Sequence, residues 1–140
     1  MSVQAILLPV FAQVTLVFFL LFWMGRARLG AIRRGEVKVA DLKRDWSAWP
    51  ERTNQISDSF RNQFQLPVLF YLVVLTALIT AQADLVFVVL AWLFVVTRVI
   101  HAYIHTGSNN VPQRFRAFLI GALILMIMWL YLLLKLFVGL

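Results

Sequence analysis

The 140-residue chain contains no cysteine, and this absence excludes a set of chemistries together. Disulfide bonds, thiolate metal sites and cysteine nucleophiles all require a side chain that the sequence lacks. Any thiol chemistry must therefore use a thiol that a substrate supplies. Acidic residues are also scarce, six against thirteen lysines and arginines, so the chain carries a formal net charge of +7.

Charge is missing altogether from four long stretches. Residues 3–24, 66–80, 85–97 and 117–134 contain no charged side chain, and 62% of the whole chain is hydrophobic. A helix needs roughly 20 residues to cross a hydrocarbon core of about 30 Å. The outer two stretches have about that length, and the inner two reach it when their helices extend into flanking residues. The sequence thus predicts an all-α membrane protein, one up-down-up-down bundle with helices over 3–24, 59–80, 84–104 and 114–138.

The distribution of positive charge predicts the orientation. Nine of the thirteen basic residues lie within 26–61, and Arg98, Arg114 and Arg116 border the third connection, whereas residues 81–84 contain none. This is the positive-inside pattern. We expect loops 25–58 and 105–113 to be cytoplasmic and both termini to lie on the other side. Membrane lipids with anionic headgroups account for the basic charge without a nucleic-acid partner.

Local signals predict how the helices begin. One of the residues 57–59 is expected to cap the second helix, and Asp84 the third. Pro67 is expected to fall within the second helix and kink it slightly, which membrane helices tolerate. Pro112 should stand just ahead of the fourth helix. No basic segment precedes the first apolar stretch and no small-residue cleavage site follows it, so we expect no signal peptide.

Polar residues inside or beside the spans are the candidates for a site. Asn62 and Gln65, three residues apart, share a helix face and either line a pocket for a hydrophilic ligand or hydrogen-bond to another helix. Arg98, His101 and His105 form one stripe on the third helix. Either Arg98 forms the base of an anion pocket, or it extends to the headgroups. Zinc is disfavoured, because the two histidines lack a third ligand nearby in the sequence.

Two further observations concern the remaining polar residues. Arg114, Arg116 and Arg28 each allow two interpretations, a guanidinium over a cavity between helices or one that meets lipid phosphate. For Gln13, in the middle of the first span, an interhelical hydrogen bond is the favoured interpretation.

Three short motifs on the four predicted helices resemble a known family: Asn62-x-x-Gln65-x-Pro67, Arg98-x-x-His101 and Pro112-x-Arg114. The family is MAPEG, the membrane-associated proteins in eicosanoid and glutathione metabolism, which includes microsomal glutathione transferases and prostaglandin E synthase. The resemblance covers essentially the whole chain. It implies a homotrimer of four-helix subunits with glutathione bound as co-substrate between subunits at the cytoplasmic end. The short spacing from Asn62 to Pro67 resembles the bacterial branch, which implies a bacterial inner membrane and periplasmic termini.

The resemblance also implies roles for individual residues. Arg114 matches the arginine that holds the thiolate, and a nearby guanidinium lowers a thiol pKa. The glutathione contacts implied are Arg28, Asn62, Gln65, Arg98, His101 and His105. Two positions depart from the family, since Gln65 stands where an acid would meet the ligand's ammonium group, and His105 where eukaryotic members usually have tyrosine. A neutral contact in place of a charged one costs roughly 1 kcal/mol.

Two functions remain open. The chain is either a glutathione-dependent transferase or peroxidase acting on lipophilic electrophiles or lipid hydroperoxides, or a non-catalytic trimer that binds a lipid or anionic metabolite in the same basic cleft. A four-helix multidrug transporter is disfavoured, because it would need an acidic residue within a span.

Overall fold

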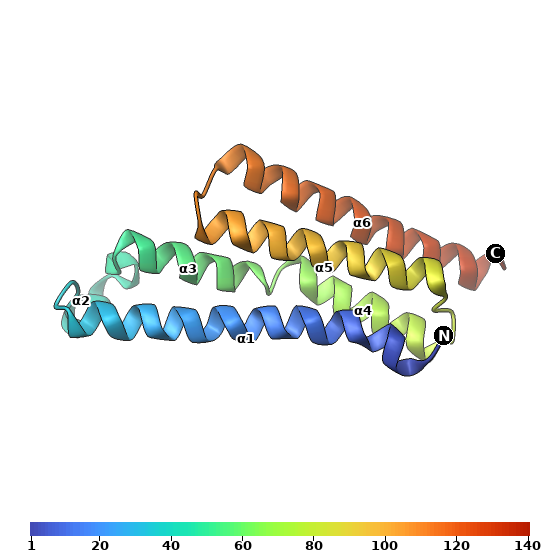
Figure 1. Cartoon of the computed structure of the whole chain (residues 1–140), viewed down its shortest axis with the longest axis horizontal. Coiled ribbons are helices and arrows are strands. Elements are labelled where there is room, and N and C mark those ends of the chain that lie inside the picture. The colour runs from blue at the N-terminus through green and yellow to red at the C-terminus, as the bar shows by residue number, and fades with distance from the viewer.

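The computed structural model describes all 140 residues, which form helices and connections without a strand. The helices are α1 (Val3–Arg33), α2 (Val39–Arg44), the short 3-10 helix η1 (Trp46–Ala48), α3 (Glu51–Asn62), α4 (Leu66–Ile79), α5 (Leu85–Thr106) and α6 (Val111–Phe137). Four segments are long and apolar enough to cross a membrane, with α3 and α4 together forming the second. They run alternately up and down, with both termini at one end and α2 at the other (Figure 1).

The first helix is longer than the sequence predicted. It continues nine residues past the expected end at residue 24 and stops at Arg33. Its end is fixed by Gly35, which has a positive φ of 71°, a conformation that glycine adopts without strain. The following Glu36 N–H then bonds back to the Ala31 carbonyl at 3.0 Å. Much of the predicted loop 25–58 is therefore helical.

The second span also differs from the prediction. Helix α3 begins at Glu51, directly after Pro50, so residues 57–59 lie inside it and none of them caps a helix. The span is interrupted at residues 63–65, and α4 starts again with Pro67 in its first turn. Proline fits a first turn, because the N–H that it lacks would have no intrahelical partner there. In a helix interior its ring would clash with the carbonyl four residues earlier, but a first turn has no preceding turn. Pro67 thus starts a new helix and does not kink a continuous one.

The other helix starts follow from capping side chains. Asp84 Oδ1 accepts a hydrogen bond from the Phe87 N–H at 3.0 Å, which confirms the predicted cap of α5. Asn110 Oδ1 accepts from the Gln113 N–H at 3.2 Å and caps α6. Pro112 therefore lies within the first turn of α6, not ahead of it.

Two apolar clusters leave a polar zone between them. The larger cluster joins α4 to the start of α5 and the later half of α6, and includes the stacked rings of Phe70 and Phe94, 4.6 Å apart. The smaller one lies at the opposite end and consists of Ala31, Val37, Leu42 and Trp49. The residues that interrupt the second span fall between the two. Polar side chains therefore gather at the level where α3 ends.

Candidate functional site

A polar cleft of about 410 Å³ lies where α3 ends and α5 connects to α6. Its lining contains no hydrophobic residue and consists of Asp58, Arg61, Asn62, Gln65, His105 and Arg114. Helix α3 contributes three of these, the cap position of α4 one, and the facing ends of α5 and α6 one each. Four of the seven predicted site residues meet here, and a volume of this size is typical of a small-molecule site.

Asp58 and Arg61 belong to this cleft and were missed by the sequence analysis. They form an ion pair on the exposed face of α3. Together with Asn62 and Gln65 they follow the spacing i, i+3, i+4, i+7, which places side chains on one helix face. Extending the Asn62–Gln65 pair backwards by one helical turn would have found both.

A chain of hydrogen bonds connects the cleft to the interior. Arg98, only 1% exposed, donates through Nη2 to Asn62 Oδ1 and, at 3.4 Å, to the main-chain carbonyl of Asn62. Asn62 Nδ2 in turn donates to Gln65 Oε1 at 3.1 Å. A guanidinium at the C-terminal end of α3 is favourable, because the last carbonyls of a helix carry partial negative charge.

The charge of Arg98 is not balanced by a carboxylate. None of the three ion pairs of the protein includes this residue. Its Nε and Nη1 atoms are buried and have no hydrogen-bond partner. Arg98 therefore does not extend to the headgroups, and its positive charge remains next to the cleft.

The two histidines continue the stripe from Arg98 toward the cleft. His101 is 3% exposed and packs against Phe118, and its ring lies edge-on to that of His105 at 5.6 Å. The Nδ1 atom of each histidine is buried without a partner. His105 lines the cleft, whereas His101 lies one turn deeper.

Arg114 is positioned by the α5–α6 connection. Its Nη1 donates to Asn109 Oδ1 at 2.6 Å. Asn109 adopts a positive φ of 51°, a conformation that asparagine tolerates better than most residues. The hydrogen bond orients the Arg114 guanidinium at the edge of the cleft and leaves its other N–H groups available to a ligand.

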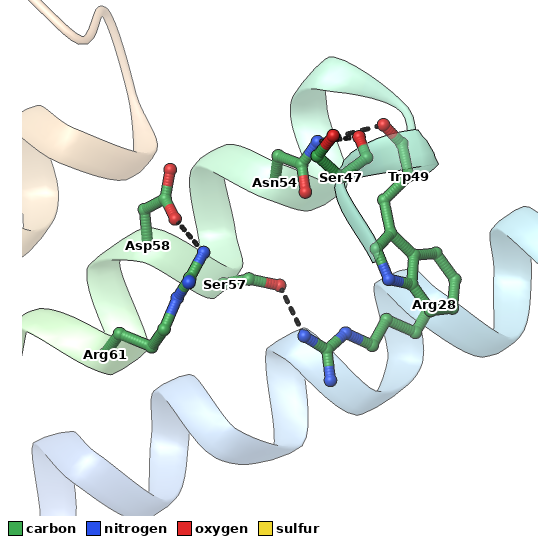
Figure 2. Close-up of polar contacts among 7 residues, drawn as sticks. All are labelled: Arg28, Ser47, Trp49, Asn54, Ser57, Asp58 and Arg61. Atoms are coloured by element: carbon green, nitrogen blue, oxygen red, sulfur yellow. Dashed lines mark hydrogen bonds and ion pairs between the residues drawn. The ribbon is translucent and has the colours of Figure 1, made fainter. Parts of the chain in front are cut away.

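Arg28 lies apart from the cleft. Figure 2 shows its guanidinium directed at Ser57, to which Nη2 donates at 3.3 Å. The same group lies 5.1 Å from the ring centroid of Trp46 and 5.3 Å from that of Trp49. Asn54 fixes this segment by donating to the Trp49 carbonyl at 3.0 Å. In this position Arg28 connects α1 to α3 and η1.

A second, mostly apolar groove of about 400 Å³ runs between α1 and α5. Phe19 and Trp23 of α1 face Val99 and Tyr103 of α5 across it. At its end Arg52 donates to the Thr106 carbonyl, and its guanidinium lies 5.4 Å from the Trp23 ring centroid. The groove thus reaches the last turn of α5, where His105 lines the polar cleft.

These features define an all-helical integral membrane protein with a basic cleft at one end of a four-span bundle. The sequence matches the MAPEG family over residues 6–134, and the chain belongs to this family. The comparisons with curated proteins and with solved structures give no match. The family includes glutathione transferases and peroxidases alongside other membrane proteins.

Proposed function

We propose that the protein is a glutathione-dependent transferase or peroxidase that acts on lipophilic electrophiles or lipid hydroperoxides. The observation that carries this proposal is the composition of the polar cleft, in which Arg61 and Arg114 lie with two amides, one histidine and one carboxylate. Glutathione has two carboxylates, one ammonium group and a thiol. Guanidinium groups bind carboxylates with paired hydrogen bonds, so Arg61 suits one carboxylate and the single acid suits the ammonium group, which leaves Arg114 for the thiol.

Arg114 is the proposed catalytic residue. A unit charge about 4 Å from a thiolate contributes on the order of 4 kcal/mol at an effective dielectric constant near 20. Solvent in the open cleft reduces this figure, so we expect the thiol pKa of bound glutathione to fall by about one to two units. The thiol proton passes to water at the cleft mouth. The thiolate sulfur then forms a bond to the electrophilic carbon while the leaving group departs with the bonding electrons.

Hydroperoxide reduction would use the same nucleophile. The thiolate attacks the terminal peroxide oxygen, the O–O bond breaks, and the alkoxide takes a proton from water. A second glutathione converts the resulting sulfenic acid to a disulfide and releases water. The lipophilic substrate enters from the bilayer through the groove between α1 and α5, which Thr106 and Gly107 line at its end, while the preceding His105 lines the polar cleft.

The homotrimer is part of this proposal. In the family, glutathione lies between subunits, and Arg28 of a neighbouring copy would complete the site that one protomer leaves without it. The basic segment 25–58 and the connection 105–113, which Arg114 and Arg116 follow, would face the cytoplasm of a bacterial inner membrane, where glutathione is available as the co-substrate.

The test is a calorimetric titration of glutathione into the detergent-purified protein, with ultraviolet difference absorbance at the thiolate band. Wild type is expected to bind and to show the thiolate signal. Arg114→Ala should lose the signal and keep the same oligomeric state, whereas Arg116→Ala, the same change two residues on, should keep both. A thiolate signal in the Arg114 variant would reject its catalytic role. Absence of binding at millimolar glutathione would reject the proposed function.

One observation favours the alternative, a non-catalytic trimer that binds a lipid or anionic metabolite. With Gln65 in place of an acid, the arginines of the cleft outnumber its single carboxylate, which suits an anion. Binding of glutathione without a thiolate signal, or displacement of glutathione by an anionic lipid, would support this second function.

A further inference from the structure

We infer that Asp58 is the acceptor for the ammonium group of the ligand and that Gln65 donates to a ligand carboxylate or carbonyl. The cleft would then select ligands that end in an α-amino-acid group, with an ammonium and a carboxylate on one carbon. This inference rests on the proposed function, because it assigns the orientation of glutathione in the same cleft.

The first step is the direction of the hydrogen bonds that begin at Arg98. A guanidinium has donors only, so the atom of Asn62 that it contacts must be the carbonyl oxygen Oδ1. The Asn62 amide nitrogen is then the donor to Gln65, and the Gln65 oxygen is the acceptor at 3.1 Å. Because the Gln65 oxygen is already bonded, the part of its amide that remains free to face the cleft is the NH₂ group. Position 65 therefore presents donors, which repel an ammonium group and bind a carboxylate.

The second step is the count of negative charges in the cleft. The chain has six acidic residues, and Asp58 alone lines the cleft. Asp84 caps α5 at the opposite end of the bundle, and Glu36 pairs with Arg34. If the ammonium group of the ligand binds in this cleft, one carboxylate is present to receive it.

The third step is the present partner of Asp58. Its carboxylate pairs with Arg61 one turn further along α3 (Figure 2), and both side chains are about half exposed or more. Such an exposed pair contributes little to stability, so a ligand replaces it at little cost. The opposite charges of Asp58 and Arg61 stand side by side, as do the ammonium and carboxylate of an α-amino acid. A zwitterionic group can therefore exchange one ion pair for two.

The experiment compares two ligands in calorimetric titrations of the full-length protein in detergent. One is glutathione and the other is glutaryl-cysteinylglycine, which lacks only the α-ammonium group. Wild type is expected to bind the second ligand roughly tenfold more weakly, the effect of one exposed charge-assisted contact. Asp58→Asn should bind glutathione about tenfold more weakly and should not distinguish the two ligands. Asp41→Asn, the same substitution away from the cleft, should behave as wild type.

Each outcome decides between the two claims. Equal affinity of wild type for both ligands, or discrimination that persists in Asp58→Asn, would overturn the role of Asp58 and leave the proposed function standing. If wild type binds neither ligand, the proposed function fails and the inference fails with it. Gln65→Glu gives an independent arm, because an acid at this position should weaken binding of glutaryl-cysteinylglycine; tighter binding would contradict the donor role of Gln65. Circular dichroism melting confirms that each variant is folded.

Discussion

Replacing Asn62 with leucine tests the link between the buried Arg98 and the cleft. Arg98 is 1% exposed, and the Asn62 side chain is the only side-chain acceptor of its guanidinium. In Asn62→Leu the guanidinium keeps only the main-chain carbonyl of residue 62, which lies 3.4 Å away. Two other nitrogens of Arg98 already lack hydrogen-bond partners, so they do not compensate for this loss.

The magnitude follows from the loss of a hydrogen bond to a buried charge. Such bonds contribute about 1.5–3 kcal/mol, and leaving a buried charge without its partner costs about 3–5 kcal/mol. Because the weaker carbonyl contact survives, we expect a loss of about 3 kcal/mol. For a chain of this size that corresponds to a fall in Tm of about 10 °C. The assay is thermal unfolding in one detergent, followed by far-ultraviolet circular dichroism.

Three control variants separate the explanations. Asn62→Asp keeps an acceptor for Arg98 and should retain the wild-type Tm. Gln113→Leu makes a comparable change at an exposed amide and should also leave Tm unchanged. Arg98→Met combined with Asn62→Leu removes the charge and its acceptor together, and should recover most of the loss. If Asn62→Leu melts within about 1 °C of wild type, far less than the expected fall of about 10 °C, the charge of Arg98 has another acceptor and the reasoning is wrong.

Two further predictions concern the helix contacts outside the cleft. A Cβ atom added at Gly121 would lie 2.7 Å from Thr97 Oγ1, so Gly121→Ala should destabilise the α5–α6 contact by about 1–3 kcal/mol, and Thr97→Ala in the same chain should restore Tm. Burial alone would raise the pKa of Asp84, but its hydrogen bonds with Lys135 and Tyr131 lower it overall from 3.8 to about 2. Its stabilising contribution is therefore present above about pH 4 and is lost as the pH falls toward 2, so the Tm advantage of wild type over Asp84→Asn should shrink across that range.

The four spans could be predicted because hydrophobic length is readable along the chain. The end of α1 could not be predicted from the same signal. The apolar stretch stops near residue 24, but a helix continues in water until a residue favours another conformation, and here that residue is Gly35. Hydrophobicity predicts which residues lie in the membrane, whereas the backbone preference of residues such as Gly35 determines where the helix ends.

The interruption of the second span shows a second limit. Pro67 is compatible with a kink inside a helix and with the first turn of a new one, and tertiary contacts decide between them. Gln13 in α1 donates to Gln63 Oε1 at 3.0 Å, which confirms the predicted interhelical bond and satisfies a side chain at the interruption. The sequence indicated that Gln13 would find a partner, but not that the partner would be the residue after α3.

The same interruption explains why the cleft residues meet at this level of the bundle. Because α3 ends at Asn62, its main-chain carbonyl accepts only the long 3.3 Å bond from the Gln65 N–H and also accepts from Arg98, whose guanidinium contacts the Asn62 side chain as well. The buried guanidinium then fixes the orientation of Asn62, and Asn62 fixes that of Gln65. An apolar residue at position 98 would avoid the burial of an unbalanced charge, but it would leave both amides free to rotate. The stability lost by burying the charge of Arg98 therefore has a structural result, a fixed pattern of hydrogen-bond donors facing the cleft. Loss of ligand affinity in the Arg98→Met, Asn62→Leu protein, at restored Tm, would separate that contribution from the contribution to folding.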